Sequence, residues 1–145
     1  TLDDAVSRVD VVVGNELLTQ SQRLVQEDQL LIVEGRVSHD DFTGGIRVTA
    51  RKLFDLATAR NQFAHHLKIS CNGQSDANKL RDILKPYCGV SQNNLKRCRV
   101  KIDYHNEKGH VELLLGENWQ VDLHDELIEG LTQWLSEENV KILYN

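Results

Sequence analysis

The first third of the chain alternates hydrophobic and polar positions in three short stretches. Val9, Val11 and Val13 are separated by single residues, which is typical of a β-strand with one buried face. The same period of two recurs in residues 29–40 and 46–53, and the run DDFTGG at their junction has the composition of a turn. These stretches therefore predict three strands, of which the last two form a hairpin.

A short amphipathic helix is expected between the first two strands. Asn15 suits a helix N-cap, and one helical face would carry Leu17, Leu18, Leu24 and Val25. The order strand, helix, strand, turn, strand matches the second half of an oligonucleotide-binding fold (OB-fold), a five-stranded barrel with its helix between strands three and four. We therefore expect residues 1–58 to be the C-terminal part of an OB-fold domain, without its first strand and most of its second.

Residues 59–145 show their own alternation of helical and extended patterns. A helical connector over 56–63 leads into a strand at 65–71, and Ser75 is expected to cap the next helix. Two strands, 98–104 and 110–115, flank a turn, and a short strand is expected at 119–122. Asp122 would cap a second helix, and residues 139–145 are extended. The pattern predicts a small α+β domain of the βαβββαβ type.

Composition limits the possible functions of the chain. Its 145 residues carry a net charge of −5, with most of the acidic excess in residues 1–58, so general phosphate neutralisation is not its main activity. No apolar run is long enough to cross a bilayer. The three cysteines form no C-x-x-C pair, which indicates reduced thiols and a cytoplasmic protein without membrane contact.

Metal and catalytic sites find no support in the sequence. His65 and His66 lie near Cys71, but adjacent residues on a strand point to opposite faces and cannot chelate one ion together. No base lies at a recognisable spacing from a nucleophilic Ser or Cys. We therefore expect no metal, no cofactor and no catalytic residue in this chain.

Several motifs resemble one protein family, in order and along the whole chain. They are TLDDAVSRVDVVV at the start, the run EGRVSHDDFTGG, the strand TARKL, the connector ARNQFA and, further on, GENWQV. Together they are similar to the C-terminal end of the alpha subunit of bacterial DNA polymerase III, the replicative polymerase. The chain also contains no methionine and begins TLDD, so we expect a segment of a longer polypeptide.

The resemblance implies a fold and a function. In that family this region is an OB-fold barrel followed by a domain that binds the tau subunit of the clamp loader. The chain would bind single-stranded template DNA weakly and tether the polymerase to tau, with the rest of the alpha chain as a further partner. The parent would be a nucleotidyltransferase whose catalytic carboxylates lie upstream. The alternative is a free-standing single-stranded nucleic-acid-binding OB-fold or protein-interaction module.

Candidate DNA-binding residues lie on or beside the barrel strands. OB-folds bind single strands through cations along the phosphates and aromatic rings that stack on bases. The residues of these types are Arg36, Phe42, Arg47, Arg51 and Lys52. The competing interpretation is that the cations pair with Glu34, Asp40 or Asp41 and that Phe42 packs against the second domain. A second basic stretch, Lys96 to Lys101, is expected to be a solvated outer strand face.

Candidate partner-binding residues lie near the C-terminus. Trp119 follows the predicted hairpin, and Ile142, Leu143 and Tyr144 form an apolar extended end. Such a segment can add to a partner's sheet or fill its pocket. The resemblance implies that this end contacts tau. The competing interpretation is that Trp119 is part of the core and that the end is simply the last strand.

Overall fold

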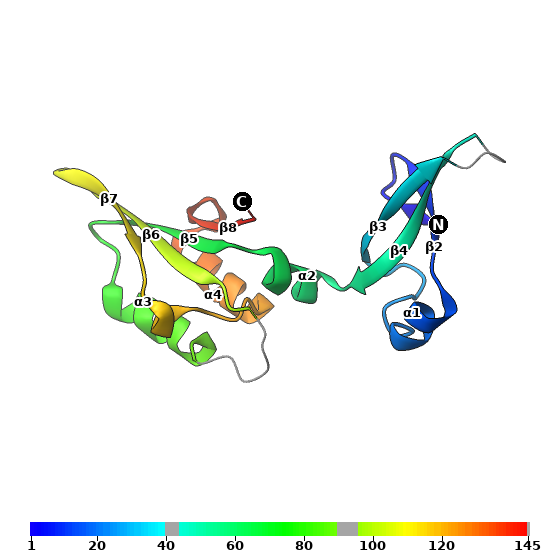
Figure 1. The fold of residues 1–145 in the computed structure, drawn as a ribbon. Coiled ribbons are helices and arrows are strands. Elements are labelled where there is room, and N and C mark those ends of the chain that lie inside the picture. Colours follow the sequence, from blue (N-terminus) through cyan, green and yellow to red (C-terminus); the bar gives the residue numbers. More distant parts are fainter. Residues whose placement is uncertain (40–43, 90–95, 145) are drawn as a thin grey trace. The chain divides into compact units, whose positions relative to one another are not determined.

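The structure, a computed structural model, describes residues 1–39, 44–89 and 96–144. It divides into two compact units, Thr1–Leu56 and Ala57–Asn145 (Figure 1). We call them unit 1 and unit 2 and describe each by itself. The chain is α+β, as predicted.

Unit 1 is a four-stranded sheet with one short helix. Its elements are β1 (Leu2–Asp3), β2 (Arg8–Val12), α1 (Asn15–Gln20), β3 (Ile32–His39) and β4 (Ile46–Phe54). The strand order is β1-β2-β4-β3, and β2 pairs with β4 in parallel. The predicted order of elements is confirmed. Within the described residues the sheet is open and forms no closed barrel, which is consistent with a partial OB-like fold.

The helix of unit 1 is shorter than its sequence pattern suggests. It ends at Gln20, so Leu24 and Val25 lie beyond it, and its N-cap is Gly14 rather than Asn15. Gly14 makes no side-chain cap, and Ser21 at the other end leaves helical geometry with φ −115° and ψ 18°. The expectation of one apolar helical face that reaches from Leu17 to Val25 is therefore wrong, because a helix of six residues is too short to carry it.

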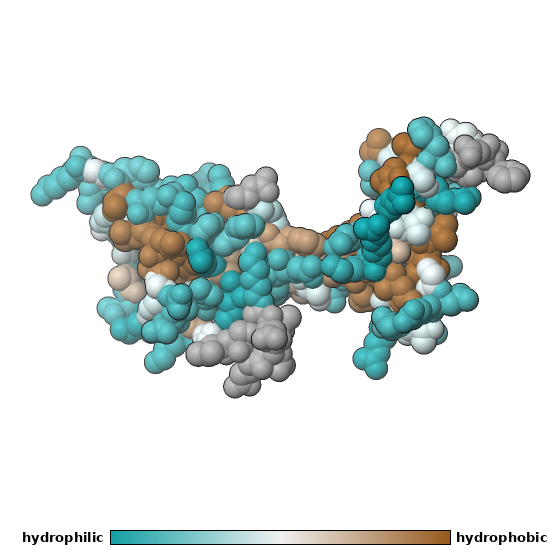
Figure 2. Space-filling view, in the orientation of Figure 1, coloured by the Kyte–Doolittle hydropathy of each residue, from teal (hydrophilic) through white to brown (hydrophobic). Residues whose placement is uncertain are grey.

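Unit 1 buries few apolar side chains. Of its described hydrophobic residues, only Leu53 and Phe54 are buried, whereas Val37 and Ile46 are 64% and 58% exposed. Figure 2 shows apolar side chains reaching the surface of this unit in several places. Burial of apolar area is the main stabilising contribution to folding, so these exposed residues contribute little to the stability of unit 1.

Unit 2 packs helices on one face of a second four-stranded sheet. It begins with α2 (Leu56–Phe63), whose first residue is the last residue of unit 1. The strand order of its sheet is β7-β6-β5-β8, and β5 and β6 are parallel. The other elements are β5 (His66–Asn72), α3 (Ala77–Leu84), η1 (Lys85–Tyr87), β6 (Arg99–Asn106), β7 (Gly109–Leu114), η2 (Glu117–Trp119), α4 (Asp125–Leu135), η3 (Glu137–Asn139) and β8 (Val140–Leu143).

The core of unit 2 lies between this sheet and helices α3 and α4. Every second residue of β5 is buried, and helix residues complete the cluster. Its fully buried large side chains are Leu67, Ile69, Leu84, Val100, Val121, Leu123, Leu127 and Leu131. The opposite face of the sheet carries the alternate, polar residues, and we call it the open face.

Three local predictions for unit 2 are wrong. The expected strand at 119–122 is η2 followed by Val121, which makes only isolated bridges to Cys88 and Cys98. Asp76 caps α3 by accepting from the backbone N–H groups of Asn78 and Lys79, because the Ser75 hydroxyl is engaged with Asn72 in the preceding turn. The N-cap of α4 is His124, not Asp122.

No helix among the described residues is both long enough and apolar enough to cross a membrane.

Candidate functional site

The predicted DNA-binding cations of unit 1 share one face of its sheet. Arg36 lies opposite Thr49 in the β3–β4 pair, and Arg47 lies two residues before Thr49 on β4. Residues directly opposite one another, and alternate residues of one strand, point to the same side of a sheet. Arg36 and Arg47 therefore lie on a common face.

A bulge places Lys52 on this face as well. Ala50 pairs with Gly35 and Lys52 pairs with Glu34, so Arg51 is an extra residue without a partner across the strand pair. Because Glu34 and Arg36 alternate on β3, Lys52 faces the same side as Arg36. A regular strand would have turned Lys52 away from it. The bulge thus puts Lys52 on the face that carries Arg36 and Arg47, with Arg51 at the bulge itself.

The bulge also accounts for the glycine at position 35. A Cβ atom there would lie 2.5 Å from the backbone oxygen of Thr49 and 2.8 Å from a Val48 methyl group. Only glycine lets the two strands approach this closely. Gly35 therefore positions the face that carries the arginines.

The competing interpretation, in which acidic neighbours neutralise these cations, has support at Lys52. Lys52 Nζ lies 3.4 Å from a Glu34 carboxylate oxygen, with both side chains about half exposed. Within the described part of the chain, Arg36 and Arg51 have no carboxylate within 4.0 Å. Phe42, with Asp40 and Asp41, lies outside the described residues.

The other face of the unit 1 sheet is apolar. Val11 pairs with Val48 in the parallel β2–β4 pair, and Val9, Val11 and Val13 line a hollow together with Leu30 and Leu31. The cationic face and the valine face are opposite sides of one sheet. Unit 1 therefore separates an apolar side from a polar, basic side.

The predicted partner-binding end of the chain is the last strand of the unit 2 sheet. Ile142 lies opposite Leu67 in the β5–β8 pair and packs against the core, whereas Leu143 lies opposite His66 on the open face. The His65 backbone N–H donates to the Leu143 oxygen at 2.7 Å. Tyr144, just beyond the strand, is 47% exposed. β8 is the last strand in the order of this sheet and pairs with β5 on one side. Among the described strands, no strand pairs with its other edge.

Trp119 lies in η2 and is half-buried against the same core. Its backbone N–H donates to the Gly116 oxygen at 2.9 Å. Of the four predicted partner-binding residues, Leu143 lies on the open face and Tyr144 is exposed, while Trp119 and Ile142 pack against the core.

The open face of the unit 2 sheet carries a network of ion pairs. Lys68 Nζ lies 2.8 Å from Asp103 Oδ2, and Lys101 Nζ lies 2.6 Å from Glu112 Oε1. Hydrogen bonds from Lys68 and His110 lower the pKa of Asp103 to about 2. In the second basic stretch, Cys98 and Val100 alternate with Arg97, Arg99 and Lys101 and are 1% and 0% exposed, so these cations lie on the side away from the core.

The described residues contain no group of three or more His, Cys, Asp or Glu side chains that could hold a metal ion. His65 and His66 have ring centroids 6.5 Å apart. Burial and the positive charges of Lys101 and Arg99 lower the pKa of His66.

Comparison with known proteins identifies relatives of the whole chain. Residues 79–135, all in unit 2, match the family described as DNA polymerase III subunit alpha, C-terminal domain. The DNA polymerase III alpha subunits of Vibrio cholerae and Escherichia coli K12 are each 33% identical over 100% of the chain. That of Pseudomonas aeruginosa is 33% identical over 99%. The chain spans 12% of the length of each of these relatives. The chain is therefore similar along its whole length to DNA polymerase III alpha subunits, and its residues 79–135 match their C-terminal domain.

Proposed function

We propose that this chain is the C-terminal part of a bacterial replicative DNA polymerase alpha subunit. It tethers the polymerase to the tau subunit of the clamp loader and binds single-stranded template DNA weakly, in the cytoplasm. The observation that carries the proposal is similarity to alpha subunits along the entire chain, through both units. Polymerisation belongs to the rest of the alpha chain, and the residues here bind and position.

Tau binding is assigned to the C-terminal edge of unit 2. The β8 strand offers an outer edge for a partner strand, with Leu143 on the open face and Tyr144 exposed beside it. Strand addition gives affinity through backbone hydrogen bonds, while neighbouring side chains give specificity. Ile142 supports this edge from the core side, and Trp119 packs against the same core from η2.

Two side-chain replacements test this assignment better than a truncation. Removing residues 139–145 would delete β8 and uncover β5, so lost binding could reflect a damaged fold. Leu143→Ser with Tyr144→Ala leaves the strand in place, and we expect it to weaken tau binding by about tenfold, the effect of removing one interface anchor. Val111→Ser is the matched control, because Val111 is similarly exposed at 45% on β7, the opposite edge of the sheet. Equal weakening in both variants, or in neither, would remove this edge from the tau site.

DNA binding by unit 1 is assigned to the face that carries Arg36 and Arg47, with Arg51 and Lys52 at the bulge. Cations spaced along adjacent strands can follow the phosphates of a single strand. The Glu34–Lys52 pair and the acidic excess of this unit predict weak, salt-sensitive affinity. Phe42 is the proposed stacking residue.

Charge reversal tests whether these arginines bind DNA or only contact solvent. Arg36→Glu with Arg51→Glu should lower affinity for an oligothymidylate and reduce the slope of log K against log salt by about one for each arginine that binds a phosphate. Arg23→Glu is the control in the same unit, since Arg23 is exposed in the segment after α1. An unchanged titration of the double variant would show that these arginines do not bind DNA.

A further inference from the structure

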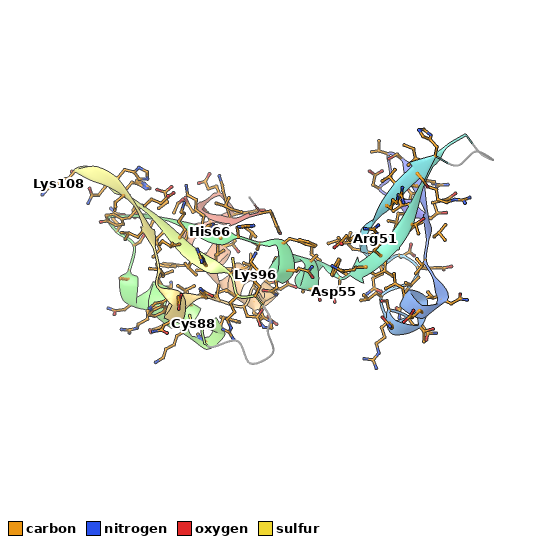
Figure 3. The ribbon with its side chains drawn as sticks, viewed as in Figure 1. Arg51, Asp55, His66, Cys88, Lys96 and Lys108 are labelled. Carbon is orange, nitrogen blue, oxygen red and sulfur yellow. The ribbon has the colours of Figure 1, made fainter. Side chains whose placement is uncertain are left out.

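A second basic surface lies in unit 2, where the chain enters β5 and β6. His66 lies opposite Arg99 in the parallel pair, and Lys96 and Arg97 lead into β6. With Lys85 of η1 and with His65 they line a concavity of about 1080 Å³. We call this surface the basic hollow. Figure 3 shows His66 and Lys96 at one end of unit 2 and Lys108 at the other.

The cations that line the basic hollow are separate from the ion pairs of unit 2. Elsewhere Arg60 pairs with Asp125, Lys68 with Asp103, and Lys101 with Glu112. In the described part of the chain, none of Lys85, Lys96, Arg97 and Arg99 has a carboxylate within 4.0 Å. Among the described residues that line the hollow, Glu117 alone is acidic. Four fixed positive charges there thus face one negative charge.

Hydrogen bonds within the fold position Arg97 and the start of β6, which line the hollow. Arg97 Nη1 donates to the Tyr87 oxygen at 2.9 Å, and the side chain is half-buried. Cys98 exchanges two backbone hydrogen bonds of 2.9 Å with Val121. Arg97 and Arg99 flank this buried residue and point to the same side, because side chains two apart in an extended segment share a face. A pre-positioned arginine such as Arg97 binds an anion at a low cost in conformational entropy.

The lining of the hollow favours nucleic acid over protein as its ligand. Asn118 and Gln120 add amide groups, and among the described lining residues there is no Leu, Ile, Val, Phe, Tyr or Trp. Protein interfaces depend on apolar and aromatic anchors at their centre. Nucleic-acid interfaces are more polar and much more positive, and arginine and lysine contacts to phosphate dominate them.

The histidine at the edge of the hollow responds to the same positive field. Burial, together with the positive charges of Lys101, Arg99 and His65, lowers the pKa of His66. A phosphate bound beside it would offset that field.

We propose that the basic hollow binds the phosphodiester backbone of a DNA strand and is a second DNA contact of this chain, separate from the arginine face of unit 1. The inference extends the proposed function, because it adds a DNA site to the unit to which tau binding is assigned. It does not depend on unit 1 binding DNA. The two sites lie on different units and are tested by different variants.

The test is fluorescence anisotropy of a labelled oligothymidylate of about 20 nucleotides, long enough for more than one OB-sized site. Lys96→Glu with Arg99→Glu is compared with Lys79→Glu with Lys108→Glu, which makes the same charge change at exposed positions that do not line the hollow. We expect the first variant to lose at least about tenfold in affinity at low salt and to have a salt slope smaller by about one to two, with the control within about threefold of the unaltered chain. Circular dichroism confirms that both variants remain folded.

Two results would overturn the proposal. One is equal affinity of the hollow variant and its control. The other is displacement of the oligonucleotide by polyglutamate at the same concentration of charge, which would assign the hollow to an acidic protein. Arg36→Glu with Arg51→Glu, measured in parallel, shows separately whether unit 1 contributes, so failure at one site is not mistaken for failure at the other.

Discussion

Lys68 and Asp103 form an ion pair across the parallel strands β5 and β6, with 2.8 Å between Nζ and Oδ2. Asp103 also contacts His110 on β7, so one carboxylate links three adjacent strands on the open face. Its side chain is 18% exposed, whereas that of Glu112 is 45% exposed, so Asp103 is the more protected carboxylate of the network. The pair therefore joins elements that are distant in sequence.

Acid should weaken unit 2 through this carboxylate. The pKa of Asp103 is lowered from 3.8 to about 2 in the folded chain, so its contribution to stability is present above about pH 4 and is lost as pH falls towards 2. We expect Asp103→Asn to lower the melting temperature at neutral pH, and the difference from the unaltered chain to shrink across this interval. Thermal unfolding followed by circular dichroism at several pH values measures it. A difference that does not change with pH would mean that the carboxylate charge contributes nothing.

Lys68, the basic partner of Asp103, has the opposite pH dependence, because its contribution to stability is lost at high pH. The hydrogen bond to Asp103 raises the pKa of Lys68 above 10.5. The stability that this lysine contributes is therefore complete below about pH 10 and is lost as pH rises through the raised pKa. Lys68→Met should reduce the loss of stability as pH rises above about 10. Lys79→Met, which alters an exposed lysine outside the network, is the comparison, and an equal effect of the two replacements would contradict the prediction.

The three thiols should differ sharply in reactivity. Burial raises the pKa of Cys98 to about 11, and Cys71 and Cys98 are only 5% and 1% exposed, while Cys88 is half-buried. Because the thiolate is the reactive form, we expect a thiol reagent at about pH 8 to modify Cys88 first in the native chain and all three residues in denaturant. Cys88→Ser should remove the first phase. Persistence of that phase would place one of the other cysteines at the surface.

The bulge of unit 1 should not tolerate a side chain at position 35. Gly35→Ser puts an atom 2.5 Å from the Thr49 oxygen, a backbone group that cannot move without breaking the β3–β4 pair. We expect a loss of about 1–3 kcal/mol in the stability of unit 1 and weaker DNA binding, because the arginine face is displaced. Gly14→Ser is the matched control, since no atom lies within 4 Å of a Cβ at that N-cap and serine suits the position. Equal stability of the two variants would rule out the close approach.

Hydrogen exchange should distinguish the two units. β4 and β5 are both paired on two sides, but the apolar residues around β5 are buried and most of those around β4 are not. Exchange protection follows burial and local stability, so we expect amides of β4 to exchange at least about tenfold faster than those of β5. Equal protection would show that the stability of unit 1 comes from interactions other than apolar burial.

Local patterns predicted much of this fold. The bounds of α2 follow from the run 56–63, and the hairpin of β6 and β7 turns at Asn106, whose side-chain oxygen accepts from the N–H groups of Lys108 and Gly109. The paired strands of unit 1 follow from alternation and from a turn-forming run. In each case the signal lies within a few residues of the structure it specifies.

Relationships between distant segments could not be predicted in this way. The extra residue at Arg51 has no local signature, and Val121 bridges to Cys88 and Cys98 without forming a strand. The basic hollow depends on the parallel register that sets His66 opposite Arg99, which the crossover through α3 fixes. The basic stretch is recognisable in the sequence, but the lack of acidic partners at Lys96, Arg97 and Arg99 among the described residues is a property of the packed sheet.

The measurement that tests the central claim most directly is a calorimetric titration of this chain with the tau subunit. We predict saturable binding of one chain to one tau subunit, weakened by Leu143→Ser with Tyr144→Ala and unchanged by Val111→Ser. An absence of binding heat at concentrations up to about 100 μM, with the chain shown to be folded, would contradict it.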